Sequence, residues 1–228
     1  MVHQKGRIVY YSPNLLAIRG LFLSEKEMHE FSNEMETTPM NATKLLIKEH
    51  AIILKVLDSL SSARNHIENG RLPEKLFFEQ AVRFSRDFSD TFHHFKEEFL
   101  MFGMLAQKKE GDIDLEIGAL RYQHEKCRGF IKGIDASLKG YGEKDELSIT
   151  MLLENLAPYI SLLRRHIYQE NHLFFPLVEQ SLTEMENQYL LEQFAKEEER
   201  FGGKTVFVTG KNQADELARM VQRIAGGM

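Results

Sequence analysis

The six residues HHFKEE, at positions 93–98, place two adjacent histidines ahead of two adjacent glutamates. Each histidine has a glutamate four residues later. In an α-helix this spacing puts the two side chains of a pair on one face, about 6 Å apart at their Cβ atoms. Such a stretch is either a charged helix surface or one part of a metal site, and the rest of the chain decides between the two.

A second stretch repeats this arrangement. Residues 166–178 read HIYQENHLFFPLV, and residues 93–105 read HHFKEEFLMFGML. Both begin with a histidine, followed by a glutamate four residues later and a phenylalanine nine residues later. The pairs His93–Glu97 and His166–Glu170 are therefore close enough to ligate one ion each, or for a carboxylate to bridge two ions.

Four long segments with helical periodicity contain or flank these motifs. They are joined by short connections, and only five prolines interrupt the chain. We predict an all-α protein that forms an up-down-up-down four-helix bundle with short N- and C-terminal extensions. Pro158 is expected to kink or break the fourth helix. The predicted helices span residues 41–69, 73–109, 113–138 and 146–182.

The flanks of the bundle carry weaker signals. The capping boxes SEKE (24–27) and TEME (183–186) are predicted to open short helices that end near residues 35 and 200. RIVYY (7–11) and KTVFVT (204–209) are predicted as short strands, and a last helix is expected over 212–224. The predicted domains are an N-terminal extension (1–40), the bundle (41–200) and a C-terminal extension (201–228).

Histidines of the first, third and fourth helices lie within apolar stripes. His50 and His124 each follow a leucine by four residues and precede an apolar residue by three. His166 follows a leucine by three residues, and Leu173 and Leu177 continue its face. We therefore expect these three imidazoles to point into the core.

The histidines also fall at similar heights along the bundle. His50 and His93 lie about 21 and 22 residues from the loop between their helices, and similar counts relate His124 to Glu97 and, within about one turn, to His166. Several histidines and two carboxylates left buried and unpaired would each cost about several kcal/mol. A bound metal removes this cost, so the sequence predicts a metal site with ligands from all four helices.

The second helix contains a conflict of phase. Its apolar stripe lies nearer to His94 and Glu98 at about 100° per residue, whereas the repeat pairs His93 with Glu97. A local irregularity at His93, or a ligand role for both histidines, would reconcile the two patterns. We favour His93 and Glu97 and keep His94 and Glu98 as candidate ligands. The stripe consists of Phe77, Phe84, Phe88, Phe95 and Phe102.

In its ligand order, the chain resembles the hemerythrin-like family, which is described by its HHE cation-binding motif. The resemblance covers about residues 41–200 and rests on LLIKEH (45–50), FSDTFHHFKEE (88–98), LRYQHEKCR (120–128) and LLRRHIYQENHLFFP (162–176). It implies a four-helix bundle that holds two irons per chain, bridged by carboxylates. The implied ligands are His50, His93, Glu97, His124, His166 and Glu170. Imidazole and carboxylate without thiolate suit iron or manganese, and zinc is possible. With the resemblance, we expect iron, with manganese or zinc less favoured.

The chain departs from the pattern of the oxygen-carrying hemerythrins at two positions. Arg128 stands four residues after His124, where a second histidine is expected, and Asn171 stands five residues after His166, where an aspartate is expected. We therefore expect four histidine ligands rather than five, and more open positions. This disfavours simple reversible oxygen carriage.

The resulting prediction is a non-haem di-iron protein that binds, senses or reduces a small molecule such as oxygen, peroxide or nitric oxide. The alternatives are a non-catalytic iron sensor or store and a metal-stabilised helical interaction module. The sequence leaves open whether a substrate is turned over.

Other side chains are assigned minor roles. Glu49, Asp90 and Glu125 are candidates to hold the second ring N–H of a ligand histidine. Cys127, one turn after His124, is expected to be a small core residue, and His172 is out of phase with Glu170.

Composition limits the partners. The net charge is −5 and no basic block stands out, so we expect no nucleic-acid partner. A single cysteine and the absence of an apolar run of about 20 residues favour a cytoplasmic protein that does not insert in a membrane. The two extensions are candidates to pair chains into a homodimer.

Overall fold

The structure is a computed structural model that describes residues 41–108 and 113–226. Every regular element in these ranges is a helix, and they contain no strand, which confirms the all-α prediction. The predicted strand at 7–11 and helix at 24–35 lie outside the described residues. The elements are α2 (Ala42–Glu68), α3 (Lys75–Phe84), η2 (Ser85–His94), η3 (Lys96–Met101), α4 (Phe102–Lys108), α5 (Asp114–Gly142), α6 (Glu146–Gln169), η4 (Glu170–Phe174), α7 (Phe175–Ser181), α8 (Glu184–Arg200) and α9 (Lys204–Gly226).

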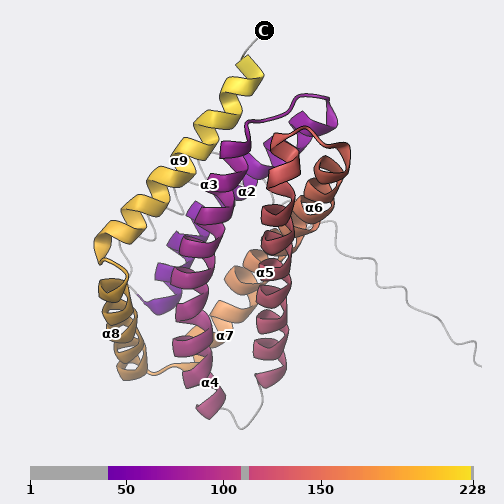
Figure 1. Ribbon diagram of the computed structural model, residues 1–228. Helices are drawn as coiled ribbons and strands as arrows, with labels where there is room; N and C mark the ends of the chain where they lie inside the picture. Colours follow the sequence, from indigo (N-terminus) through magenta and orange to yellow (C-terminus); the bar gives the residue numbers. More distant parts are fainter. Residues whose placement is uncertain (1–40, 109–112, 227–228) are drawn as a thin grey trace, which may run out of the picture. The chain divides into compact units, whose positions relative to one another are not determined.

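Four helical rods form the bundle (Figure 1). The first is α2 and the third is α5. The second rod is continuous from α3 to α4 and the fourth from α6 to α7, and each contains segments with the wider π-type hydrogen bonding, which carry the label η. Contacts join α5 to α6, α2 to α6 and α3 to α5, as a four-helix bundle requires.

The boundary between the third and fourth rods differs from the prediction. α5 continues to Gly142 instead of ending near residue 138. Gly140 acts in helix packing, because a Cβ at this position would lie 2.0 Å from Oγ of Ser148 in α6. Asp145 then caps α6 by accepting a hydrogen bond from the backbone N–H of Ser148, at 2.8 Å. Of the two effects expected of Pro158, a kink or a break, the break is absent, because α6 runs through it as one helix.

The predicted strand at 204–209 is wrong. These residues begin α9, a single helix that includes the helix expected at 212–224. Local β-propensity is overridden here because α9 packs along α2 and α3 (Figure 1) and buries one apolar face there. Its buried apolar residues include Ala214, Leu217 and Val221. The predicted capping box before α8 is confirmed, with Thr183 and Glu186 as its two residues.

The apolar core consists of two clusters separated along the bundle. On α2, residues up to Leu46 belong to one cluster and residues from Ile52 onward to the other. On α5, residues up to Leu120 belong to the first and residues from Cys127 to the second. His50 and His124 fall between the two clusters, so a polar layer crosses the core at their height.

No helix in the described ranges has both the length and the apolar character needed to cross a lipid bilayer.

Gly210 tests how tightly α9 packs. A Cβ at this position would lie 2.3 Å from the buried ring of Phe88. We expect Gly210→Ala to cost about 1–3 kcal/mol through overpacking, more than the gain in helix propensity. Gly129→Ala is the control, since nothing lies within 4 Å of its Cβ and it should stabilise by up to about 1 kcal/mol. Urea unfolding of both variants measures the difference, and equal stabilities would contradict the packing of α9.

Candidate metal centre

Two adjacent histidines reach the core because the second rod is π-helical around them. In a π-helix each N–H bonds to the carbonyl five residues back, so successive side chains diverge by less than the 100° of an α-helix. The π-type segments η2 and η3 lie on either side of Phe95. His93 and His94 are both buried, 1% and 3% exposed. The structure thus contains the local irregularity that the conflict of phase required.

The fourth rod contains a similar irregularity at η4, which begins at Glu170, four residues after His166. The π-type turn there shifts which side chains face the core. Leu173 and Leu177, expected to continue the inward face, are 60% and 42% exposed. Phe174 and Val178 are buried in their place. The expectation for the two leucines is wrong because it assumed a regular α-helical period across the π-type turn.

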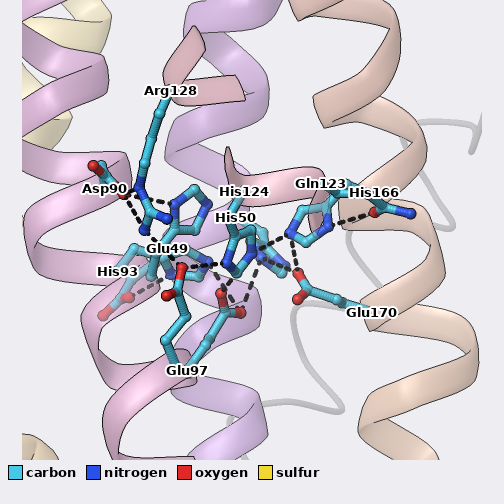
Figure 2. A network of polar contacts seen from close by, with 12 residues as sticks. Glu49, His50, Asp90, His93, Glu97, Gln123, His124, Arg128, His166 and Glu170 are labelled. Atoms are coloured by element: carbon cyan, nitrogen blue, oxygen red, sulfur yellow. Dashed lines mark hydrogen bonds and ion pairs between the residues drawn. The ribbon is translucent and has the colours of Figure 1, made fainter. Parts of the chain in front are cut away.

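Seven buried side chains from the four rods converge in the polar layer (Figure 2). They form two groups, and within each group one ligand-type atom per residue lies within 4.8 Å of all the others. The first group is His50, His93, Glu97 and Glu170. The second group is His94, Glu97, His124 and His166. Glu97 belongs to both, so its carboxylate lies between two positions that could each hold an ion.

The distances give Glu97 one oxygen for each group. Its Oε1 lies 3.3 Å from Nε2 of His93 and 3.8 Å from Nε2 of His50. Its Oε2 lies 3.6 Å from Nε2 of His124. Glu170 is also placed between the groups, because its Oε2 lies 3.3 Å from Nε2 of His50 and 3.1 Å from Nε2 of His166.

Several atoms in the layer lack a hydrogen-bond partner although they are buried. They are Nε2 of His50 and His93 and both carboxylate oxygens of Glu97 and Glu170. Nε2 of His124 and Nε2 of His166 face each other at 2.9 Å. Unpaired groups of this kind are costly in a low-dielectric interior. Cations bound in the layer would satisfy all of them, so the donor set fits a pair of metal ions.

Each of the five histidines is oriented by a contact at Nδ1, the ring nitrogen that points away from the centre of the layer. Nδ1 of each lies within hydrogen-bonding distance of a side-chain oxygen, which favours the tautomer with a proton on Nδ1 and a lone pair on Nε2. The pairs are His50 with Asn171 (2.7 Å), His93 with Glu49 (2.8 Å), His94 with Asp90 (3.2 Å), His124 with Glu98 (2.7 Å) and His166 with Gln123 (2.8 Å). All five rings therefore present Nε2 to the centre of the layer.

The structure sorts the candidate residues into two sets. The candidates that lie in the two groups are His50, His93, His94, Glu97, His124, His166 and Glu170. Five imidazoles reach the layer instead of the four expected, because His94 joins His93. Glu98 lies behind His124 and outside both groups.

Of the three candidates for holding a ring N–H, Glu49 and Asp90 have that position. Glu125 instead pairs with Arg128 at the surface, at 2.6 Å. Sequence reasoning missed Gln123 and Asn171 in this role. Only their positions in the sequence could have indicated this role. Gln123 directly precedes His124, and Asn171 stands at the aspartate position of the hemerythrin pattern.

Arg128 binds two of the orienting carboxylates, and its position beside Asp90 is visible in Figure 2. Its Nε donates to Asp90 at 2.8 Å, and its NH2 group donates to Glu98 at 2.6 Å. Burial opposes ionisation of Asp90, but the hydrogen bonds from His94 and Arg128 outweigh it and lower the pKa of Asp90 to about 2. The Arg128 guanidinium therefore binds both acceptors, Asp90 behind His94 and Glu98 behind His124.

The pKa values of the layer's histidines diverge in the absence of a cation. Burial lowers the pKa of His94, and burial with the nearby His94 and His166 lowers that of His124. Burial alone would also lower the pKa of His93, but Glu97 and Glu49 outweigh it and raise it to about 10. Glu170 likewise outweighs burial and raises the pKa of His166. In the absence of a cation a proton on His93 therefore offsets part of the carboxylate charge, and a metal bound at His93 has to displace it.

Lys96 connects the layer to α8. It is 1% exposed, and its Nζ donates to Glu49, the acceptor for His93. The same Nζ lies 3.3 Å from Glu198 of α8 and 3.7 Å from the ring centroid of Phe92. The buried ammonium is thereby paired from two helices and an aromatic face.

The remaining histidine and cysteine candidates take no part in the layer. His172 is exposed and lies outside both groups. Burial raises the pKa of Cys127 to about 12, so its thiol stays protonated at neutral pH. A protonated, buried thiol is neither a good metal ligand nor a reactive nucleophile, which supports the prediction that Cys127 is a core residue.

The comparison with protein families points to cation binding. A family model described as Hemerythrin HHE cation binding domain matches residues 41–178. The chain is also similar to an uncharacterised protein of Mycobacterium bovis and to one from each of two strains of Mycobacterium tuberculosis. Each shares 22% identity over 172 residues, which cover 75% of this chain and 67% of the relative. No solved structure gives a significant match.

The raised pKa of His93 makes the stability of the metal-free protein depend on pH. Between about 6.5 and 10 the folded state holds a proton on His93 that the unfolded state releases, so stability falls as pH rises through this window. We expect a loss of about a few kcal/mol between pH 7 and 9.5 in urea unfolding of chelator-treated protein. His93→Gln is the control, and its stability should change less with pH than that of the parent protein. An equal pH dependence in the two proteins would contradict the assignment to His93.

Removing the charge of Lys96 should destabilise the fold. Lys96→Met leaves the Glu49 carboxylate buried without its ammonium partner, which should cost about 3–5 kcal/mol. Lys211, which is 63% exposed and pairs with Asp215, provides the matched control. We expect Lys211→Met to change stability by less than about 1 kcal/mol. Thermal unfolding followed by circular dichroism distinguishes the two, and similar midpoints would contradict the role of Lys96.

Proposed function

Because this chain belongs to the hemerythrin HHE cation-binding domain family, we propose that it is a non-haem di-iron protein that binds, senses or reduces oxygen, peroxide or nitric oxide. The observation that carries the proposal is the pair of buried ligand groups that share Glu97. Their unpaired Nε2 and carboxylate atoms are the atoms that a cation would satisfy. Cation binding follows from the family, whereas two irons and a small-molecule ligand are our inference.

The donor set favours iron. Five imidazoles and two carboxylates with no thiolate suit iron, with manganese or zinc less favoured. His50, His93, Glu97 and Glu170 would hold one ion, and His94, His124, His166 and Glu97 the other. An iron pair, when bound, supplies one-electron chemistry and positions at which oxygen, peroxide or nitric oxide coordinates.

The two proposed positions are unequal. One has two histidines and the other has three, while Glu97 and Glu170 lie between them. A position with two histidines and carboxylates resembles the open sites of non-haem iron proteins that react with oxygen. An iron held by His50 and His93 would therefore be the one that supplies binding chemistry for a small molecule. Oxygen carriage was disfavoured because only four histidine ligands were expected. With five histidines in the layer that reason no longer applies, so oxygen carriage is a candidate function together with reduction and sensing.

The chain's own residues control water and protons around this layer. The ring of His50 stacks on Phe175 with 5.6 Å between centroids, and Phe102 stacks over His124 at 6.3 Å. These rings belong to the apolar cluster that closes one end of the layer. They exclude bulk water, which strengthens electrostatic interactions inside the layer. The acceptors at each Nδ1 keep every ring in one tautomer.

An iron sensor or store is the second candidate. The same unpaired buried atoms favour it, because a cation that satisfies them also stabilises the fold. At a free metal concentration 100 times its dissociation constant, the gain is about 2.7 kcal/mol per site. Peroxide or oxygen turnover with little change in stability favours the first candidate. A large loss of helix on chelation without turnover favours the second. A cytoplasmic location and a homodimer remain proposals from the sequence.

Metal content tests the proposal directly. Protein purified without chelators from iron-rich medium should contain about two irons per chain by mass spectrometry. Glu97→Ala removes the shared ligand and should lose most of the iron, with the fold checked by circular dichroism. His172→Ala removes an exposed histidine outside the layer and should keep it. No iron in the parent protein, or equal iron in the parent and Glu97→Ala, would reject the di-iron proposal.

A further inference from the structure

A cavity of about 380 Å³ lies between η2, α5 and α6, beside the polar layer. His94 forms part of its wall, and Arg86 and Lys132 on its rim are exposed. This volume falls in the range of small-molecule sites, about 300–1,000 Å³, and is far more than oxygen or peroxide needs. The cavity therefore fits a larger molecule than the proposed metal ligand.

The surface of the wall is largely apolar, although several polar and charged side chains also line the cavity. Cys127, Ile131 and Leu163 are its buried apolar side chains, joined by the ring of Tyr159. The Tyr159 hydroxyl is occupied, because it donates to the hydroxyl of a neighbouring serine at 3.0 Å. Ser89 also lines the cavity, and its buried hydroxyl has no hydrogen-bond partner among the described residues. The Ser89 hydroxyl is thus an available polar contact beside these apolar side chains.

The charges around the cavity are predominantly positive. Arg86, Arg128 and Lys132 line it, together with a single carboxylate, Asp90. Arg128 and His94 already bind that carboxylate, and Arg86 pairs with Asp135 at 2.7 Å. Lys132 makes no ion pair or hydrogen bond within the described part of the chain. An unpaired cation at the mouth favours an anionic group there.

We propose that this cavity binds a small organic carboxylate with an apolar body. The carboxylate pairs with Lys132 at the mouth, and the body packs against Ile131 and Leu163. Ser89 offers one hydrogen bond to a polar group on that body. Occupancy changes the surroundings of His94 and of its acceptor, Asp90, without taking a position among the Nε2 atoms. The site is therefore distinct from the one proposed for oxygen, peroxide or nitric oxide.

Binding of 4-fluorobenzoate, followed by ¹⁹F nuclear magnetic resonance, tests this proposal. The full chain is titrated as purified and again after metal removal, so that an absent metal site would not affect the result. We expect saturable binding in both forms and weaker binding of the neutral analogue 4-fluorobenzyl alcohol. Ile131→Trp fills the cavity and should weaken 4-fluorobenzoate binding at least about tenfold. Ile131→Phe replaces it if circular dichroism shows that the tryptophan variant is unfolded.

A matched pair of lysine variants tests the contribution of the Lys132 charge. Lys132→Gln should weaken binding of the carboxylate about threefold and leave binding of the alcohol unchanged. Lys139→Gln removes an exposed lysine seven residues further along α5, outside the cavity, and should change neither. Three results would each overturn the proposal: no saturable binding up to about 10 mM, equal affinity in a folded cavity-filling variant, or an alcohol that binds as tightly as the carboxylate.

Discussion

The polar layer in the middle of the bundle imposes the strictest physical constraint on this structure. Apolar side chains need only matching volume, but five imidazoles and two carboxylates also need direction. Each imidazole is fixed at Nδ1 by a separate oxygen acceptor. His93, for example, depends on Glu49 of a different rod, and His166 depends on Gln123. The layer therefore fixes the register of the four rods against one another, while the apolar clusters on either side supply most of the burial.

Much of this arrangement could be predicted from the sequence, because it depends on the spacing of residues that are close together in the chain. The helices, the order of the histidines and the two His-x-x-x-Glu motifs are all periodic signals. The conflict between His93 and His94 was visible as well, but its solution was not. Helical phase was calculated at 100° per residue, and the π-type segments violate this assumption at the site itself.

The other failures have a common physical origin in tertiary contacts. The strand predicted at 204–209 is a helix because α9 packs against α2 and α3 and buries its apolar face there, which local propensity cannot reveal. The roles of Gln123 and Asn171 depend on which rods face each other. Arg128 is the most informative position, since it stands where the hemerythrin pattern has a histidine. The chain still brings five imidazoles together, because His94 of the second rod supplies the fifth.

The contact between Lys96 and Glu198 changes what counts as the smallest independent unit of this protein. The segment matched by the family model ends at residue 178, whereas the ammonium group behind Glu49 is covered by α8, which begins at Glu184. A fragment cut at the family boundary would leave that ammonium open to water and remove one of its two carboxylate partners. α8, which lies beyond the matched segment, therefore shields the His93 side of the layer from water. An expression fragment designed from the family boundaries alone would omit this helix.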